Sequence, residues 1–138
     1  MINVEWKGGM RFDASSESGK TFTMDAHPDY GGQDQGPTPV EAFVSALAAC
    51  SAMDVISVLR KKRYEVDSYR IEVDRERSAP EGTYPRPITK FVIRHIVKGE
   101  GIDPAQVEKA VNLSEEKYCT IMATMRENPT VETSIEVN

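Results

Sequence analysis

The chain has 138 residues, a length that predicts one domain, residues 1–138, built around a single hydrophobic core. Seventeen Lys and Arg residues against 22 Asp and Glu residues give a net charge of −5. That charge has the wrong sign for a protein that binds nucleic acid by neutralising phosphates. With 39% hydrophobic and 28% charged residues, the chain is expected to fold along its whole length.

The N-terminal residues lack the basic and then apolar layout of a signal peptide, so we expect a cytoplasmic protein. The most apolar stretch, Ala42 to Leu59, contains three serines and an aspartate and falls short of the roughly 20 apolar residues of a transmembrane helix. It is therefore predicted to be a buried helix, and no membrane partner is expected. Two cysteines do not make a structural disulfide framework, so any role they have is as thiols.

The first third of the chain predicts an antiparallel meander of three short strands. These strands are expected at Ile2 to Trp6, Met10 to Ala14 and Lys20 to Asp25, separated by turns rich in glycine and serine. Residues 27–37 contain three Gly, two Pro and almost nothing apolar, which predicts a loop that could cover a site.

A long helix is predicted next. Thr38 can cap it, Pro39 suits its first position, and Glu41 completes a capping box. The helix runs for about 23 residues, roughly 35 Å, and ends in four cations at residues 60–63, where the helix dipole favours them. Its residues are apolar nearly all round, so it must be enclosed on every side. A domain this small can scarcely enclose such a helix alone, and we expect a second copy of the chain to complete the cover.

The second half predicts a hairpin with one polar face, two short helices and a final strand. These elements are expected, in chain order, at residues 64–77, 88–98, 103–112, 114–126 and 130–137. Cys119 would then lie in the early turns of the second short helix.

The two cysteines are candidates for chemistry. Cys50 lies in the middle of the long helix, one turn from Asp54, and a free cysteine in such a place is most often a small buried hydrophobe. Cys119 follows two glutamates near a helix start, where unpaired amides favour the thiolate and the carboxylates oppose it. Their wide separation in the sequence does not fit a zinc site, which takes four ligands in close pairs.

Other chemical signals are weaker. We interpret His27, in the loop, and His95, in a strand, as structural. The sequence has no phosphate-binding glycine loop, no His-x-x-x-His and no serine nucleophile elbow. Glu41 is explained by the capping box, with a polar role near Cys50 as the alternative. Taken alone, Arg11 is typical of an exposed strand residue.

The run GPTPVEAFVSALAACSAMDV, followed by a strand pair and then AVNLSEEKYCTI, resembles the OsmC and Ohr family of osmotically inducible and organic hydroperoxide resistance proteins. The resemblance spans essentially the whole chain, and the segments CSAMDV and LSEEKYC are most similar to the YhfA-like branch. It implies an α+β fold in which two curved antiparallel sheets surround long central helices. It also implies that two protomers intertwine as a homodimer.

The resemblance implies a thiol-dependent peroxidase that reduces organic hydroperoxides, with Cys50 as the peroxidatic thiol and Cys119 as the resolving thiol. A dithiol is the implied reductant, and no metal, flavin or haem is required. In the family an N-terminal arginine holds the thiolate and orients the peroxide, which points to Arg11. Because attack at neutral pH needs a thiolate, we expect an arginine beside Cys50, with Arg11 the first candidate and Arg86 the second.

Two positions depart from the family pattern. The family glutamate directly follows the motif proline, where this chain has Val40, and Glu41 comes one residue later, rotated by about 100° on the helix. Thr120 stands where a proline usually follows the second cysteine. These departures favour the alternative of a non-catalytic dimer that binds a small apolar or thiol-reactive ligand at its interface, or a stress protein without turnover. The presence of both cysteines favours the peroxidase.

Overall fold

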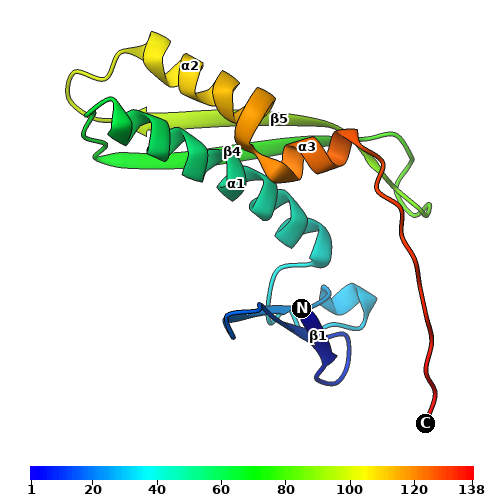
Figure 1. Cartoon of the computed structure of the whole chain (residues 1–138). Coiled ribbons are helices and arrows are strands. Elements are labelled where there is room, and N and C mark those ends of the chain that lie inside the picture. Colours follow the sequence, from blue (N-terminus) through cyan, green and yellow to red (C-terminus); the bar gives the residue numbers. More distant parts are fainter. The chain divides into compact units, whose positions relative to one another are not determined.

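The computed structural model describes all 138 residues and divides into two compact units, Met1–Ala46 and Leu47–Asn138. It has the predicted α+β composition, with one antiparallel sheet in each unit and helices beside them (Figure 1). The long helix α1, Pro39–Lys61, begins in the first unit and continues into the second.

The first unit contains the predicted meander, in the order β1-β2-β3. Its strands are Asn3–Trp6, Phe12–Ser15 and Thr21–Met24. The register places Val4 and Phe22 on either side of Ala14, and Trp6 opposite Phe12, so these apolar side chains share one face. Ala14 is buried, but the larger side chains around it are exposed. One face of this sheet is therefore apolar and largely uncovered.

The predicted loop contains a short 3-10 helix, η1 (Pro28–Tyr30), and is tied to the sheet by Asp25. The buried Asp25 carboxylate accepts backbone N–H bonds from Ala26, Gln33 and Gln35 at 2.8, 3.1 and 3.2 Å. Burial alone would raise the pKa of Asp25, but these three bonds, together with the charge of Arg11, lower it below its ordinary value. The ionised carboxylate therefore ties the loop to the end of the sheet.

Helix α1 begins at the predicted capping box. The backbone N–H and the hydroxyl of Thr38 donate to the Glu41 carboxylate at 2.8 and 2.9 Å, and the Glu41 N–H donates to Thr38 Oγ1 at 3.3 Å. The helix ends with two cations in its last turn, Arg60 and Lys61. Both ends therefore follow the sequence signals that predicted them.

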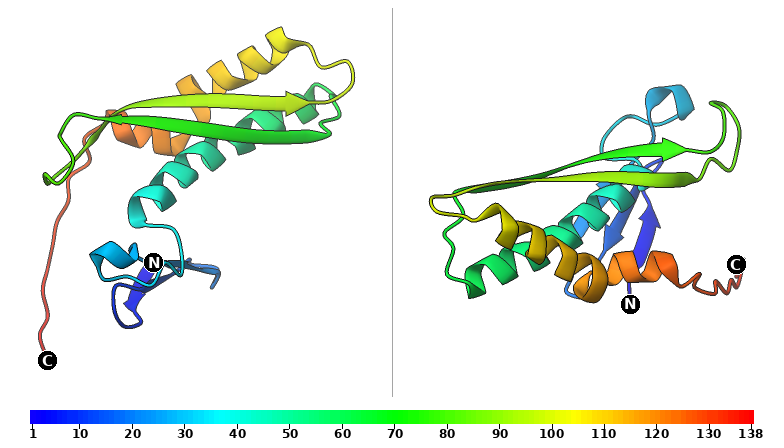
Figure 2. Two further views of the ribbon diagram at one scale, coloured as in Figure 1. Left: turned by 180° about the vertical axis from the view of Figure 1, so that it is seen from behind. Right: turned by 90° about the horizontal axis from the view of Figure 1, so that it is seen from above.

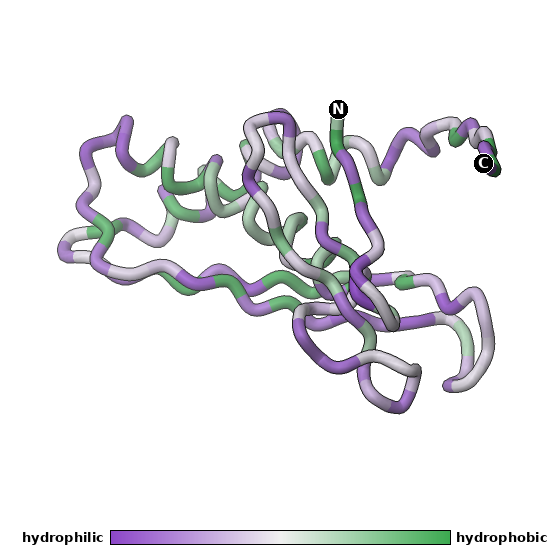
Figure 3. The backbone as a smooth tube through the Cα atoms, turned by 90° about the horizontal axis from the view of Figure 1, so that it is seen from below, coloured by the Kyte–Doolittle hydropathy of each residue, from purple (hydrophilic) through white to green (hydrophobic).

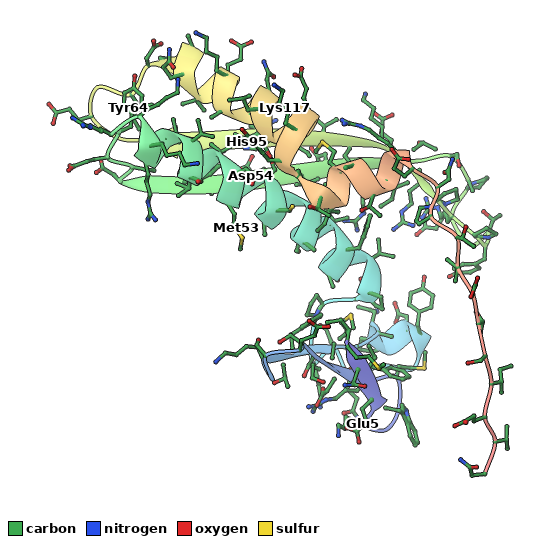
Figure 4. The ribbon with its side chains drawn as sticks, in the orientation of Figure 1. Glu5, Met53, Asp54, Tyr64, His95 and Lys117 are labelled. Carbon is green, nitrogen blue, oxygen red and sulfur yellow. The ribbon has the colours of Figure 1, made fainter.

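A single chain encloses α1 only in part, as the small size of the domain predicted. Buried residues form only one stripe along it: Val44, Leu47, Ser51, Val55 and Leu59. Only 28% of its most apolar window is buried, and by length and composition it could cross a membrane, a test that core helices of soluble proteins also pass. Met53 is 72% exposed and projects away from the hairpin (Figure 4). One side of α1 is therefore left exposed by this chain.

In the second unit, β4 (Ser68–Arg77) and β5 (Ile88–Lys98) form the predicted antiparallel hairpin. Strand β4 begins later than predicted because Tyr64 takes part in the end of α1. Its N–H donates a hydrogen bond to the Leu59 carbonyl at 3.1 Å. The second part of α1, with α2 (Pro104–Leu113) and α3 (Thr120–Arg126), covers one face of the hairpin (Figure 2). Apolar and polar residues alternate along both strands (Figure 3).

The core of the second unit consists of two apolar clusters. The first is built on Leu47, Cys119 and Met122, and the second on Val55, Leu59 and Ala110. Along the chain, polar residues lie between the residues that contribute to the first cluster and those that contribute to the second. Ser51 and Asp54 occupy this position on α1, Ser114 occupies it after α2, and His95 occupies it on β5. We call these four residues the polar layer.

Residues 114–126 do not form the single helix that was predicted. Ser114–Tyr118 make a π-helical turn, η2, in which the Cys119 N–H donates to the Ser114 carbonyl at 2.8 Å. Cys119 itself is extended, with φ −69° and ψ 101°, and α3 begins at the next residue. Cys119 therefore lies at a break between two helices and not within the early turns of one.

The strand predicted for residues 130–137 is not formed. Residues after Arg126 have no regular secondary structure, and Val131, Ile135 and Val137 are exposed. Alternating β-branched residues favour a strand, but a strand also needs a neighbour for its backbone hydrogen bonds. Neither sheet of this chain pairs with the segment.

His95 gives the fold a dependence on pH. Its Nδ1 lies 2.7 Å from the Tyr69 hydroxyl, while its Nε2 is buried without a hydrogen-bond partner. Burial lowers the pKa of His95, and the charge of Glu115 opposes this shift. Burial also raises the pKa of Tyr69 to about 12, so Tyr69 stays neutral. Because folded His95 binds a proton less readily than unfolded histidine, stability is lost as the pH falls through about 6.5 toward the folded value.

We expect His95→Asn to flatten this dependence, because the asparagine amide oxygen can accept from Tyr69 but does not titrate. The measurement is the free energy of unfolding in urea at several pH values between 7 and 5. The wild-type value should fall more steeply with decreasing pH than that of the variant. Parallel curves would show that His95 does not cause the loss.

Candidate functional site

The structure brings the two cysteines together in the first apolar cluster. Cys50, on α1, packs against the core residues that include Cys119, and both cysteines are free. The two side chains are close enough for Cys50 to affect the pKa of Cys119. Cys119 is only 2% exposed, whereas Cys50 is partly exposed. The pair therefore has one thiol that solvent reaches and one that it does not.

Burial raises the pKa of the Cys119 thiol, and the side-chain hydrogen bond with Cys50 raises it further. The backbone N–H groups of Met122 and Ile121 oppose the shift, although the sulfur makes no regular cap hydrogen bond at the start of α3. The expectation that helix amides and the preceding glutamates decide the state of this thiol is therefore corrected, because burial dominates. At neutral pH Cys119 is a thiol and can act as a hydrogen-bond donor.

A group of polar side chains that the sequence did not reveal joins the elements carrying the cysteines. The Ser114 hydroxyl donates to Asp54 Oδ2 at 2.9 Å, and its oxygen lies 3.3 Å from the Ser51 hydroxyl. Ser51 and Ser114 are both fully buried. Asp54 was expected beside Cys50, but its observed partner is the serine that begins the turn leading to Cys119.

Arg11 lies in the first unit, where its guanidinium is fixed by three hydrogen bonds. Its Nε and Nη2 each donate to the Asp13 carboxylate at 3.1 Å, and its Nη1 donates to Gln35 Oε1 at 3.0 Å. The hydrogen bond and the charge of Asp13 raise the pKa of Arg11, and Arg11 with Thr23 lowers the pKa of Asp13. Arg11 also lines a polar hollow of about 360 Å³.

The other predicted site residues have local partners. Glu41 forms the capping box with Thr38, as the structural interpretation predicted. Arg86 Nε donates to the Ala79 carbonyl at 2.9 Å and so holds the loop of the hairpin. An arginine beside Cys50, and a polar role of Glu41 near that thiol, both stay predictions.

A hollow of about 320 Å³ opens beside the cluster that contains the thiols. Its lining includes Leu47 and Met122, which belong to that cluster, together with Phe91, Ile93 and Met125. Glu115 and Arg126 supply its charged groups. This volume and lining are suited to a small, mainly apolar molecule. No three His, Cys, Asp or Glu side chains gather as metal ligands would.

The difference in burial predicts the order in which the thiols react. Because an alkylating agent needs an accessible thiolate, iodoacetamide at pH 8 should modify Cys50 about tenfold faster than Cys119 or more. Peptide mass spectrometry over a time course gives both rates. In urea the two rates should become similar, and faster labelling of Cys119 in the folded protein would contradict the assignment.

Comparison with known proteins agrees with this architecture. The sequence pattern of OsmC-like proteins matches residues 32–134. The chain is 34% identical over 134 residues to Protein YhfA of Escherichia coli strain K12. The aligned region covers 97% of this chain and 95% of that protein.

Two solved structures have a similar fold. An OsmC-like protein of unknown function from Vibrio cholerae has a TM-score of 0.74 at 24% identity and covers 90% of this chain and 91% of its own. An organic hydroperoxide resistance protein from Legionella pneumophila has a TM-score of 0.60 at 16% identity and covers 93% and 89%. The fold is that of the OsmC-like proteins. The chain belongs to the OsmC family and, within it, to the YhfA-like branch.

Proposed function

We propose that this protein is a thiol-dependent peroxidase that reduces organic hydroperoxides in defence against oxidative stress. The observation that carries the proposal is that a partly exposed Cys50 packs against the apolar cluster that contains the buried Cys119. The mainly apolar hollow beside the cluster that contains the cysteines supports an organic substrate over hydrogen peroxide. Family membership supports the same class of reaction.

In the first step the Cys50 thiolate attacks one oxygen of the peroxide bond. The O–O bond breaks, the alcohol leaves after taking up a proton, and Cys50 becomes a sulfenic acid. The Cys119 thiol then attacks this sulfur, so that a disulfide forms and water leaves. The depth of Cys119 suits this role, because the resolving thiol needs to meet only Cys50.

A dithiol reductant completes the cycle by thiol–disulfide exchange. One of its thiolates attacks the disulfide, and its second thiol releases both cysteines while the reductant becomes a disulfide itself. Sulfur atoms carry all the electrons, so the proposed cycle needs no metal, flavin or haem. In this cycle Arg11 stabilises the Cys50 thiolate and orients the peroxide, and Glu41 lines the same site. For this role the Arg11 guanidinium would have to exchange part of its bonding to Asp13 and Gln35 for the thiolate and the peroxide.

We also propose that the working form is an intertwined homodimer in the cytoplasm. Two apolar surfaces without cover support this. One is the side of α1 that carries Met53, and the other is the face of the first sheet that carries Val4, Trp6 and Phe22. Contiguous exposed apolar surfaces are typical of interfaces between proteins.

The peroxidase is tested by consumption of cumene hydroperoxide with dithiothreitol as reductant, compared with hydrogen peroxide. Cys50→Ser should abolish consumption, and Cys119→Ser should lower turnover and leave Cys50 over-oxidised. Arg11→Ala should lower the rate about a hundredfold without unfolding the protein, because it removes a charge that stabilises the transition state. Arg94→Ala, which removes an exposed arginine that pairs with Glu72 on the hairpin, is the matched control and should have little effect.

A wild-type protein that consumes no peroxide, or a Cys50→Ser variant as active as wild type, would overturn the peroxidase. The second candidate, a non-catalytic dimer that binds a small apolar or thiol-reactive ligand, would then account for the hollow and the accessible thiol.

The dimer is tested by sedimentation at micromolar concentration. Wild type should sediment as a dimer whose unfolding temperature rises with protein concentration. Phe22→Asp, which puts a charge on the apolar face of the first sheet, should shift the equilibrium toward monomer. Thr21→Asp changes the neighbouring position on the opposite face and should not. A compact wild-type monomer with an unchanged circular dichroism spectrum would contradict the dimer.

A further inference from the structure

The proposed reaction requires Cys119 to stay against Cys50, yet Cys119 lies at a break between η2 and α3. We propose that Ser114 and Asp54, supported by Ser51, form a clamp that positions Cys119 against Cys50 and so sets how readily the disulfide forms. The inference rests on the proposed function and names its positioning residues.

Ser114 makes contacts in two directions. Its side chain reaches α1, where the hydroxyl donates to Asp54 at 2.9 Å and lies 3.3 Å from Ser51. Its backbone carbonyl accepts the Cys119 N–H at 2.8 Å. A single residue therefore connects the backbone of Cys119 to α1.

The α1 side of the clamp comes from the turn that carries Cys50. Ser51 is the next residue and Asp54 lies one helical turn further on, so a rigid segment of helix holds the thiol and both clamp partners. Movement of η2 away from these partners would also move Cys119 away from Cys50. The hydrogen bonds thus act on the separation of the two sulfurs, although neither serine contacts the reacting atoms.

The π-helical turn shows why a clamp is needed. A π-turn takes up one residue more than an α-turn, and one residue corresponds to about 100° of rotation around a helix. If η2 relaxed to a regular α-helix continuing α2, Cys119 would turn away from its present direction toward Cys50. The Ser114 hydrogen bonds at the first residue of η2 oppose that change.

Stability alone does not explain these buried polar groups. Ser51 and Ser114 are fully buried between two apolar clusters. Apolar residues of similar size that replace a buried polar group and its partner together are often neutral or stabilising. A hydrogen-bonded group does something that apolar packing does not, because it is satisfied in only one register of η2 against α1.

The expected effect is on the redox equilibrium of the cysteine pair with dithiothreitol. Two thiols and oxidised dithiothreitol give the protein disulfide and reduced dithiothreitol, so the reaction balances without peroxide. Removing the clamp lowers the effective concentration of Cys119 at Cys50. Ser114→Ala and Asp54→Ala should each lower the equilibrium constant for disulfide formation about tenfold, which makes the reduction potential about 30 mV less negative.

The experiment is a redox titration of the full chain in dithiothreitol buffers, with free thiols counted by alkylation. Asp54→Asn is the conservative variant, because its amide oxygen can still accept from Ser114, and it should behave nearly as wild type. Ser57→Ala, an exposed serine on the same helix, is the matched control. The double variant of Ser114 and Asp54 should shift no further than either single variant, since both remove one interaction.

Kinetics add a readout that a purely structural role would not move. After one equivalent of cumene hydroperoxide, Ser114→Ala should form the Cys50 sulfenic acid at the wild-type rate. The disulfide should then form about tenfold more slowly, the same factor expected at equilibrium if the loss lies in effective concentration. Dimedone trapping and mass spectrometry separate the two steps. The slower step should also increase over-oxidation of Cys50 to the sulfinic acid.

Equal potentials in wild type and Ser114→Ala would overturn the clamp. So would an Asp54→Asn variant that loses as much as Asp54→Ala, and the Asp54 pair decides the matter if Ser114→Ala fails to fold. If the reduction potentials shift as expected but the wild-type protein consumes no peroxide, the clamp is supported and the proposed peroxidase is contradicted. A wild-type protein in which diamide makes no intramolecular disulfide would overturn both.

Discussion

The second unit depends on the hydrogen bonds of its polar layer, which fix how its elements are aligned. Apolar clusters alone are tolerant of small shifts, because leucine, valine and methionine side chains pack in several arrangements of similar energy. A buried hydroxyl against a carboxylate is satisfied in one arrangement only, and any slip leaves both groups unpaired. Ser114 and Asp54 therefore select the alignment of η2 on α1 from those that the apolar residues allow. The contact between the two thiols follows from that selection.

The distribution of charge shows which surfaces face water and which need cover. The outward face of the hairpin carries cross-strand ion pairs, Arg94 with Glu72 and Lys90 with Glu76, at 2.8 and 2.9 Å. Such exposed pairs add little stability, but they mark a face that is suited to solvent. Between Glu41 in its first turn and the cations of its last turn, the only charged side chain on α1 is Asp54, which accepts a hydrogen bond from Ser114. The outward face of the hairpin is thus rich in charged residues, whereas the exposed side of α1 is mainly apolar.

Local signals predicted the elements whose ends are decided by nearby residues. The capping box of Thr38 and Glu41 gave the start of α1, and the alternation along β5 gave both of its ends. Asp103, which accepts the Ala105 N–H at 2.9 Å, gave the start of α2. In each case the hydrogen bonds or the burial pattern that end the element are encoded within a few residues of that end.

The predictions that were wrong concern residues whose interaction partners are far away in the sequence. Ser114 followed by two glutamates is typical of a helix N-cap, whereas its hydroxyl is used by Asp54, so the break at Cys119 was missed. The two serines buried between apolar residues, Ser51 and Ser114, were the available signal for that contact. Alternation at residues 130–137 was a necessary condition for a strand but not a sufficient one. Which arginine serves Cys50 is likewise a property of assembled elements and not of a local pattern.

Cys50 and Cys119 are synthesised at different times, because about 70 residues separate them in the sequence. A ribosome needs several seconds to add that many residues, at about 5 to 20 residues per second. During part of this time Cys50 has left the exit tunnel, but Cys119 has not yet been synthesised. A nascent chain that met an oxidant in that interval would hold a sulfenic acid with no neighbour to condense with. The completed fold provides a second thiol for this sulfur, and the growing chain does not.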